Sequence, residues 1–481
     1  MSQQKELTPI RFGTDGWRAV IAEDFTFANL ERVSQAFADF ILQTQTNASS
    51  GAEANAPALV VLGYDNRFLS DLFARRAAEV LAGNGLRAAL FEMALPTPVI
   101  SWAVKENNAA GGVVITASHN PADFNGFKIK APWGGSASPE TTSLVESLVD
   151  ARPPQRGAGN TADEREMLAA SINSYREQLA SLVDMERLRR SRLRIVVDPM
   201  HGSGGRMVES FLQGGDIECE TIRANRDPLF GGVNPEPIDR NLGPLKKRIL
   251  EVGASLGLAT DGDADRVGAV NEKGETMTMH EVVPLVLLHL ARERKMTGGV
   301  VRTFSQSILT KRIAEAHGLK LYDTPIGFKY VAELMLKTDI LIGAEESGGI
   351  GVKGHIPERD GILNCLLLLE AVIAAGRPPS EMVKEMHREF GEFYFGRRDL
   401  HCEVSRGREL VETLARTSPA KVAGHMVRDV ETLDGTKLLL DDESWLLFRQ
   451  SGTEPVLRIY SEATSKAKTE ELLNEGEQIL K

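Results

Sequence analysis

Short runs of apolar, β-branched residues alternate with longer helical patterns along most of the chain, and this alternation restricts the fold more than any other feature. A short strand followed by an amphipathic helix buries both apolar faces when helices cover a sheet, as in α/β folds. The pattern restarts three times, at ALVVLGYD, LRIVVDP and GGVVRTF. We therefore predict three similar α/β domains with mixed, largely parallel sheets, followed by a C-terminal α+β domain.

The third strand of each α/β unit ends in a loop rich in charged or hydroxyl-bearing residues. These loops read TASHNP, DGDADR and AEESGG. Ligands of open parallel sheets bind beyond the carboxyl ends of the strands. We therefore expect the loops to converge on one central cleft, with the domains spanning residues 1–160, 161–274, 275–388 and 389–481.

The composition excludes some classes of partner. The 481 residues are 42% hydrophobic and 26% charged, and 56 basic against 67 acidic residues leave a net charge of −11. That charge disfavours binding to nucleic acid or an anionic membrane. Three scattered cysteines form no disulfide framework, which suits a reducing compartment. The first residues lack a signal-peptide core, and the longest apolar run, ILNCLLLLEAVIAAG, is too short to span a bilayer. We expect a cytoplasmic protein.

The segment DGDADR places Asp261, Asp263 and Asp265 at alternate positions after the apolar strand SLGLAT. Carboxylates this close repel one another, and a hard divalent cation such as Mg²⁺ relieves the repulsion. An EF-hand loop is a competing interpretation, but Arg266 stands where that loop needs glycine. A solvated acidic turn is the other alternative. We favour a metal site.

The segment RQSGTEPVLR has the composition of a phosphate-binding loop. Ser451, Gly452 and Thr453 offer hydroxyls and free backbone N–H groups, flanked by Arg449 and Arg458. Oriented N–H donors and planar guanidinium groups together suit a phosphate. A plain turn between two strands is the alternative.

The loop AEESGG offers Glu345 and Ser347, an acceptor and a donor that suit neighbouring sugar hydroxyls. Lys329 in GFKY, and Lys353, His355 and Arg359 in VKGHIPERDG, add cationic groups to the same domain. Taken singly, each of these four is expected to be a solvated surface charge.

Ser118 and His119 follow the buried run GGVVITA. They could be a nucleophile and its base, but neighbours in an extended segment point in opposite directions. A turn would relax that geometry, yet no third group to orient the histidine is evident. Alternatively, Ser118 carries a phosphoryl group, which would add a ligand to the aspartate triplet. We rank the phosphate carrier above a hydrolase, with a polar turn close behind.

Five motifs in this order, RFGTDGWR, TASHNP, DGDADR, the EES loop and RQSGTEP, resemble those of the α-D-phosphohexomutases. Phosphoglucomutase and phosphomannomutase are the best-known members of that family. The resemblance covers nearly the whole chain and implies four domains around a central cleft. It also implies a cycle in which a phosphoserine gives its phosphoryl group to a hexose monophosphate and recovers one from the bisphosphate intermediate.

The resemblance implies a role for each motif. Ser118 is the phosphoserine, with His119 in its loop, and Ser118 with the three aspartates holds Mg²⁺. Arg18, Lys128 and Arg266 are catalytic cations, of which Lys128 is the candidate general acid/base. The substrate-binding residues are Lys329, Glu345, Ser347, Arg449, Ser451, Gly452, Thr453 and Arg458.

The segments TPIGFKY, EESGG and IPERDG resemble the glucose-type members most. Gly349 stands where many mannose-type members have histidine, which also favours glucose. The expected activity is interconversion of glucose 1-phosphate and glucose 6-phosphate, with glucose 1,6-bisphosphate as intermediate and activator. A phosphomannomutase or bifunctional enzyme is the alternative, and a non-catalytic sugar-phosphate-binding protein is one from another class. A monomer or homodimer is expected.

Overall fold

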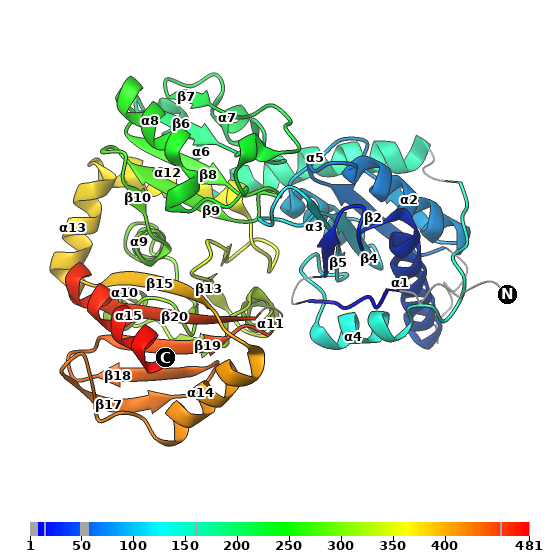
Figure 1. The fold of residues 1–481 in the computed structure, drawn as a ribbon. Coiled ribbons are helices and arrows are strands. Elements are labelled where there is room, and N and C mark those ends of the chain that lie inside the picture. Colours follow the sequence, from blue (N-terminus) through cyan, green and yellow to red (C-terminus); the bar gives the residue numbers. More distant parts are fainter. Residues whose placement is uncertain (1–7, 14–15, 49–56, 159–161, 453–454, 481) are drawn as a thin grey trace. The chain divides into compact units, whose positions relative to one another are not determined.

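The structure is a computed structural model that describes residues 8–13, 16–48, 57–158, 162–452 and 455–480 (Figure 1). The chain divides into two compact units. The first unit comprises Met1–Thr276 and Gly349–Ile373, and the second comprises Met277–Gly348 and Ala374–Lys481. The chain therefore passes between the units more than once.

The first sheet of unit one has the strand order β1-β5-β4-β2-β3. Its strands β2, β3 and β4 are mutually parallel, whereas β5 runs antiparallel to β4 and β1. The strand β4, with the sequence GGVVI, is buried along its whole length, as its continuous apolar run predicts. The elements are β1 (Trp17–Val20), β2 (Leu59–Tyr64), β3 (Arg87–Leu90), β4 (Gly111–Ile115), β5 (Phe124–Lys130), α1 (Phe27–Ala48), α2 (Ser70–Gly83), α3 (Thr97–Glu106) and α4 (Pro139–Ser147).

The second sheet of unit one has the order β10-β9-β8-β6-β7, with β6 parallel to β7 and β8, and β9 antiparallel to β8. Its elements are α5 (Ala162–Leu182), α6 (Met185–Arg190), β6 (Arg194–Asp198), α7 (Met207–Leu212), β7 (Glu218–Thr221), the 3₁₀ turns η1 (Phe230–Gly232) and η2 (Asp239–Asn241), α8 (Gly243–Val252), β8 (Leu256–Thr260), β9 (Val267–Asn271) and β10 (Thr276–Met277). The strand β14 (Ile350–Val352) and the helix α12 (Gly361–Ala375) follow where the chain returns to this unit.

The third α/β sheet has the order β12-β11-β13-β14, and its strands β12-β11-β13 repeat the orders β3-β2-β4 and β7-β6-β8 of unit one. The three strands are again parallel. The prediction of three similar α/β domains with mixed sheets is therefore confirmed. The elements are α9 (Met279–Leu288), the π-helical turn η3 (His289–Glu293), β11 (Gly299–Thr303), α10 (Ile308–Ala316), β12 (Leu321–Thr324), α11 (Phe328–Lys337), β13 (Ile340–Ala344) and α13 (Pro379–Phe390).

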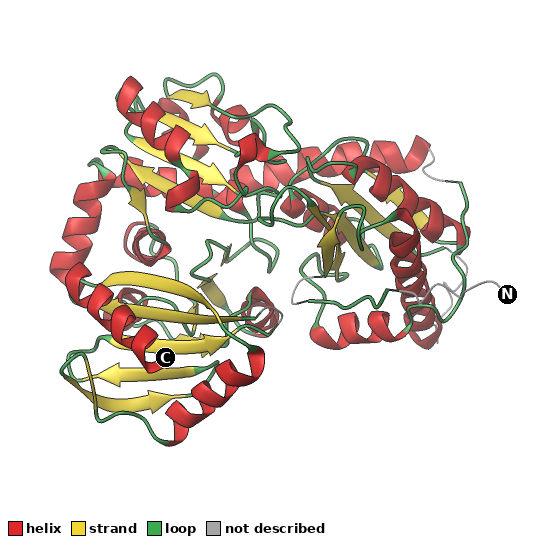
Figure 2. Ribbon diagram, in the orientation of Figure 1, coloured by secondary structure: helices red, strands yellow, loops and turns green. Residues whose placement is uncertain are grey.

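The C-terminal part of unit two is an antiparallel sheet with the order β15-β20-β19-β18-β17-β16 (Figure 2). This matches the predicted α+β domain. The elements are β15 (Tyr394–His401), α14 (Val404–Arg416), β16 (Lys421–Val422), β17 (His425–Glu431), β18 (Thr436–Leu440), β19 (Trp445–Gln450), β20 (Val456–Ala463) and α15 (Lys466–Leu480).

The two faces of this sheet differ because side chains alternate along each strand. Leu446 and Phe448 of β19 pack with Leu473 of α15 in the apolar core of the domain. The opposite face carries polar and aromatic side chains, among them Lys437, Trp445, Arg449, Arg458 and Glu462.

Glu462 on this second face attaches the sheet to the third α/β domain. Its carboxylate accepts hydrogen bonds from the backbone N–H of Ile308 (2.9 Å) and the hydroxyl of Ser307 (2.5 Å), at the first turn of α10. Trp445 Nε1 donates to the same carboxylate at 3.0 Å. Carboxylates are stabilised at helix N-termini because the N–H groups there are unpaired. The contact therefore joins the two domains of unit two.

Lys437 makes a second attachment to the same loop. Its buried ammonium donates to the carbonyl of Phe304 at 2.8 Å and lies over the rings of Phe304 and Trp445, 4.8 and 4.4 Å from their centroids. Burial, followed by the charge of Arg302, lowers the pKa of Lys437 to about 8, although Glu431, Glu462 and Asp323 act to raise it.

We expect Lys437→Met to change how stability depends on pH. The lowered pKa means that the unfolded chain binds more protons than the folded one between about pH 8 and pH 10.5, so wild-type stability gains on the order of 3 kcal/mol there. The gain is absent below pH 8 and absent from the variant. Urea unfolding at pH 7 and pH 10 measures the difference, with the exposed Lys421→Met as control. Parallel pH curves for the wild type and Lys437→Met would contradict the expectation.

No single helix in the described part of the chain is long and apolar enough to cross a membrane, although α12 and α13 together reach the required length and composition. The helix α12 contains the apolar run ILNCLLLLEAVIAA, and every residue from Gly361 to Val372 is buried. An all-round apolar helix of this kind is typical of a protein core.

Candidate functional site

Ser118 lies in the turn between β4 and β5. Its φ of 50° is in the left-handed region, which is costly for residues other than glycine. The turn is held by the backbone N–H of Ser118, which donates to Thr116 Oγ1 at 2.8 Å. The serine is only 2% exposed, and its hydroxyl donates to Asp261 Oδ2 at 2.7 Å. Strained, buried polar residues of this kind concentrate at functional sites.

Arg67 organises the serine loop from the neighbouring strand end. Its guanidinium is fully buried, forms an ion pair with Asp65 at 3.2 Å and donates to the carbonyls of Ser118 (2.7 Å) and Asn120 (2.6 Å). It also donates to the carbonyls of Pro121 and Phe124. Arg67 was not among the residues predicted from the sequence. The pattern that could have indicated it is the polar segment DNR directly after β2, at the sheet edge where the serine loop also begins.

The aspartate triplet lies against the serine loop within unit one. One oxygen from each of Asp261, Asp263 and Asp265 lies within 4.8 Å of the others, and all three residues are completely buried. Gly262 permits this approach, because a Cβ there would lie 2.4 Å from the carbonyl oxygen of Ser118. The first two of the three predicted polar loops therefore meet in one unit.

The charges of this cluster are only partly balanced by protein groups. Burial, and then the charges of Asp263 and Asp265, raise the pKa of Asp261 well above its usual value. Burial also acts to raise the pKa of Asp263, but Lys128, a hydrogen bond from Thr97 and Arg359 outweigh it and lower that pKa. The neighbouring cations of the protein therefore do not balance the charge of all three carboxyl groups.

A divalent cation fits this donor set. Asp263 Oδ1 and Asp265 Oδ1 are buried and have no hydrogen-bond partner among the described residues. Leaving a buried carboxylate oxygen unpaired is costly, and a metal ion removes the cost. All the available donors are hard oxygen atoms, which is the preference of Mg²⁺.

The predicted cations of unit one contact this cluster or the serine loop beside it. Lys128 Nζ donates to Asp265 Oδ2 at 2.9 Å and lies 3.4 Å from Asp263 Oδ2. Arg18 donates to the side chain of Asn120 at 2.7 Å. The backbone N–H of Arg266 donates to Asp261 Oδ1 at 3.1 Å, and its guanidinium lies 3.6 Å from Glu236.

Arg359 was expected to be a solvated surface charge, and that prediction is wrong. It is 7% exposed, and its guanidinium lies 3.0 Å from Asp265 Oδ2. His355 is buried as well and lies 3.1 Å from Asp360. Both residues are about 90 positions from the triplet in the sequence. Folding brings both into unit one, where Arg359 contacts the triplet.

His119 lies beside the serine rather than pointing away from it, because the left-handed turn breaks the alternation of an extended strand. Its Nδ1 is 3.4 Å from Ser118 Oγ. Burial, followed by the charges of Arg266, Arg18, Arg67 and Arg359, lowers the pKa of His119 well below its usual value. The imidazole is therefore neutral at pH 7 among several fixed cations.

Unit two carries the predicted sugar loop directly after β13. Glu345 is 6% exposed, and its carbonyl accepts from the N–H of Gly348 at 3.3 Å, which closes the turn around the half-buried Ser347. Glu346 anchors the loop, because its carboxylate accepts from the Ser305 hydroxyl at 2.6 Å.

The predicted phosphate loop joins β19 to β20. Arg449 and Arg458 face each other in the register of these strands, and Arg458 lies 3.8 Å from Asp399. The N–H of Ser451 donates to the carbonyl of Val456 at 2.9 Å, so the expectation that this N–H is free is wrong. A Cβ added at Gly452 would meet no atom of the described residues within 4 Å, and Thr453 lies outside the described residues.

Lys329 is the second residue of α11 in the third α/β domain, and its ammonium lies 5.0 Å from the centroid of the Tyr330 ring. Asp434 connects this region to the phosphate loop. Its Oδ2 accepts from the backbone N–H of Ile326 at 2.8 Å and from Arg449 Nε at 2.9 Å. Within unit two, the structure therefore links the predicted phosphate loop to the segment that carries Lys329.

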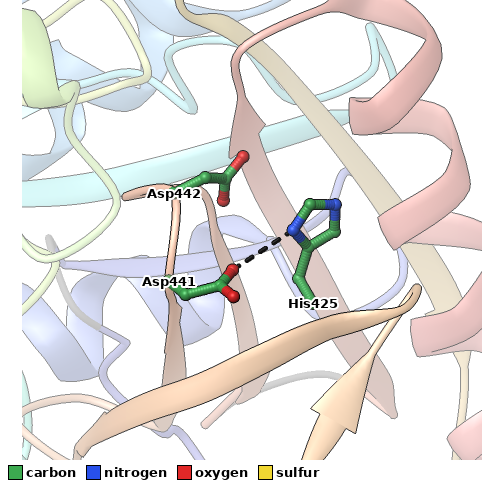
Figure 3. Close-up of side chains that lie close together, drawn as sticks. All are labelled: His425, Asp441 and Asp442. Atoms are coloured by element: carbon green, nitrogen blue, oxygen red, sulfur yellow. Dashed lines mark hydrogen bonds and ion pairs between the residues drawn. The ribbon is translucent and has the colours of Figure 1, made fainter.

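A second group of potential metal ligands, His425, Asp441 and Asp442, lies on the C-terminal domain (Figure 3). His425 Nδ1 contacts Asp441 Oδ1 at 3.2 Å. Asp442 is satisfied by other groups: it accepts hydrogen bonds from Lys468 and from the N–H and hydroxyl of Ser444. The ammonium of Lys468 already neutralises this carboxylate, which favours a surface ion-pair network.

Four family models, each named phosphoglucomutase/phosphomannomutase, match successive parts of the chain. The α/β/α domains I, II and III match residues 9–156, 173–274 and 279–390, and the C-terminal domain matches residues 403–477. Together they cover most of the sequence in the same order as the predicted motifs.

Individual relatives align over almost their full length. A phosphoglucomutase/phosphomannomutase from Thermococcus kodakarensis is 32% identical over 98% of both chains. A phosphoglucosamine mutase from Carboxydothermus hydrogenoformans is 29% identical over 96% of this chain and 97% of its own. The crystal structure of a proposed phosphomannomutase from Thermus thermophilus has 39% identity and a TM-score of 0.84, covering 98% of this chain and 99% of that one.

Proposed function

Because the chain belongs to the phosphoglucomutase/phosphomannomutase family of sugar-phosphate mutases, we propose that it interconverts glucose 1-phosphate and glucose 6-phosphate. In this proposal Ser118 carries the phosphoryl group and glucose 1,6-bisphosphate is the intermediate. We assign four domains, 1–160, 161–274, 275–388 and 389–481. The family-model matches support that division.

The observation that carries the proposal is the contact between the Ser118 hydroxyl and Asp261, inside the cluster of three carboxylates. A phosphoryl group on Ser118 would replace the donated hydrogen with anionic oxygen beside three acidic groups. Such an arrangement is stable only with additional positive charge. Mg²⁺ held by Ser118, Asp261, Asp263 and Asp265 would supply that charge and polarise the transferring group.

The protein groups of unit one would then orient and neutralise the reacting atoms. In the first step the bond between Ser118 Oγ and phosphorus breaks and a bond between a sugar oxygen and phosphorus forms. The sugar hydroxyl gives up its proton to the acid/base, and Ser118 Oγ takes up a proton as it becomes a hydroxyl again. Arg67 fixes the serine loop through four carbonyls. Lys128 and Arg18 approach from β5 and β1, and Lys128 is the proposed acid/base. Phosphoryl transfer depends mainly on this positioning and charge balance.

In this proposal His119 only exchanges a hydrogen bond near Ser118, whereas a hydrolase would need it as the general base. A neutral imidazole 3.4 Å from Ser118 Oγ could accept a hydrogen bond or donate one to a phosphoryl oxygen. No carboxylate among the described residues contacts its ring, so the pair lacks the third group of a hydrolytic triad. The phosphate-carrier interpretation is therefore favoured.

Unit two would bind the rest of the substrate. Two like charges directly opposite each other on neighbouring strands destabilise a sheet, and Arg449 and Arg458 form such a pair. A phosphate between them would convert the repulsion into two bidentate contacts. We assign the substrate phosphate to these arginines with Ser451, Gly452, Thr453 and Lys329, and the sugar hydroxyls to Glu345 and Ser347.

The choice of sugar distinguishes this proposal from its alternatives. TPIGFKY, EESGG and IPERDG, with Gly349 in place of a histidine, support glucose. The alternatives are mannose, glucosamine and a bifunctional enzyme, because relatives with these activities in their names align over nearly the whole chain. A sugar-phosphate-binding protein without catalysis remains the alternative from another class.

We expect kcat/KM to be at least about tenfold higher for glucose 1-phosphate than for mannose 1-phosphate or glucosamine 1-phosphate, since a site built for one set of hydroxyls leaves groups unpaired with another. Coupled assays with Mg²⁺ and the matching bisphosphate activator measure the three values. Equal values for glucose and mannose would instead identify a bifunctional enzyme, and a preference for glucosamine would overturn the assignment.

A further inference from the structure

The carboxylate of Asp434 contacts two segments that sequence alone does not relate. The residue lies in the hairpin turn between β17 and β18. It accepts one hydrogen bond from Arg449 Nε on β19 and one from the backbone N–H of Ile326, three residues before Lys329. Both contacts use the same oxygen, Oδ2, at 2.9 and 2.8 Å. Asp434 therefore bridges the C-terminal domain and the third α/β domain within unit two.

The hairpin is shaped to bring this carboxylate to Arg449. Thr436 pairs with Phe448 in the sheet register, so the preceding turn lies beside Arg449 at the end of β19. Gly435 has a φ of 99°, and a Cβ there would lie 2.3 Å from the carbonyl oxygen of Phe448. Only glycine permits this close approach, so the turn is built to lie against β19.

The contact with Asp434 orients the arginine in a specific way. It uses only Nε, and the two terminal nitrogens of Arg449 have no hydrogen-bond partner among the described residues. These terminal nitrogens are the pair that binds a phosphate bidentately. The hydrogen bond to Asp434 holds the guanidinium of Arg449 in place. The side chain is 18% exposed, so the guanidinium remains accessible to a ligand.

We propose that Asp434 is a positioning residue, which holds Arg449 and the segment carrying Lys329 at a fixed spacing so that cations from two domains bind one substrate phosphate. The inference rests on the proposed function, in which Arg449 and Lys329 contact that phosphate. Asp434 itself does not contact the substrate. Its effect is on the geometry and pre-organisation of the groups that do.

The test is Asp434→Asn, which keeps the size of the side chain and an acceptor oxygen but removes the charge. We expect the KM for glucose 1-phosphate and the Kd for glucose 6-phosphate, measured by titration calorimetry, to rise about 10- to 100-fold. We expect kcat to change less than about threefold, because the interaction acts equally on bound substrate and transition state. The matched control is Asp323→Asn, which neutralises the carboxylate that lies 2.5 Å from Arg302 elsewhere in unit two. This variant should leave KM and Kd unchanged.

A double-mutant cycle separates positioning from a structural role. Asparagine at position 434 keeps an acceptor for the N–H of Ile326, so the variant mainly weakens the contact with Arg449. If the charge of Asp434 acts through Arg449, adding Asp434→Asn to Arg449→Gln should therefore raise Kd less than about twofold further. If Asp434 had only a structural role, Asp434→Asn would instead lower the melting temperature both alone and in the double variant, and the effects of the two substitutions on Kd would be additive. An unchanged KM and Kd in Asp434→Asn, or additive effects in the cycle, would overturn the inference.

These outcomes distinguish failure of the inference from failure of the proposed function. A wild type that turns over glucose 1-phosphate, with an Asp434→Asn variant of normal KM, contradicts only the inference. A wild type that binds glucose 6-phosphate without turnover contradicts the proposed function, and the Kd comparison still tests Asp434. A wild type that neither turns over nor binds hexose phosphate contradicts both.

Discussion

Replacing Ser118 with alanine is expected to lower kcat for hexose-phosphate interconversion by about 10⁴-fold or more, since loss of a nucleophile removes the covalent route. The wild type incubated with glucose 1,6-bisphosphate should gain the mass of one phosphoryl group, and the variant should not. The fold should persist, because the main interaction lost is the hydrogen bond to the buried Asp261 carboxyl, worth about 1.5–3 kcal/mol, which is less than the total stability of a typical domain.

A matched control for this variant is Ser171→Ala, which removes another buried serine of unit one whose hydroxyl donates to Met167. It should keep both turnover and phosphorylation. Full activity in Ser118→Ala would require another phosphate carrier and would remove the basis of the proposed mechanism. A wild type that gains no phosphoryl group from the bisphosphate would have the same consequence.

Neutralising Asp263 is expected to have the second largest effect. Asp263→Asn keeps the size of the side chain and an acceptor for Thr97 Oγ1, which now donates to Asp263 at 2.7 Å. It removes one of the carboxylates that would hold Mg²⁺. Changes in residues that merely support metal ligands cost 10- to 100-fold in affinity, so loss of a ligand should raise the half-saturating Mg²⁺ concentration by at least about tenfold.

Two measurements check the Asp263 prediction. The Mg²⁺ dependence of turnover gives the concentration for half-maximal activity, and calorimetric titration with Mg²⁺ gives binding without turnover. Asp441→Asn, at the exposed member of the cluster around His425, is the control and should change neither. If Asp263→Asn kept the Mg²⁺ dependence of the wild type, the triplet would not be the metal site.

The parts of the fold that sequence predicted are those encoded locally. Continuous apolar runs indicate buried strands, and a 3.6-residue period indicates helices. The order of these elements predicted three similar α/β domains and an α+β domain, and the sheet orders confirm it. The loops with Ser118 and Asp261 could be named because parallel strands present their carboxyl ends at one edge.

The residues that sequence missed are defined by contacts over long distances in the chain. Arg67 donates to loop carbonyls more than 50 residues away. Arg359 reaches Asp265, and Asp434 joins Ile326 to Arg449. A single arginine or aspartate in a loop has no periodic pattern to mark it, and most such residues are solvated. The orientation of His119 was left open for a related reason, because the left-handed turn at Ser118 cannot be read from an apolar strand.

The sequence alone determined the architecture and the kinds of chemistry in each loop, because apolar periodicity and residue type act locally. It identified a serine, three clustered carboxylates and a basic loop of phosphate-binding composition. Only the tertiary structure decided which charges balance which. Burial strengthens electrostatic interactions and makes an unpaired charge costly, so Lys128 lies with Asp265, Arg67 with the serine loop, and Asp434 with Arg449. Those pairings exist only once the domains have folded around them.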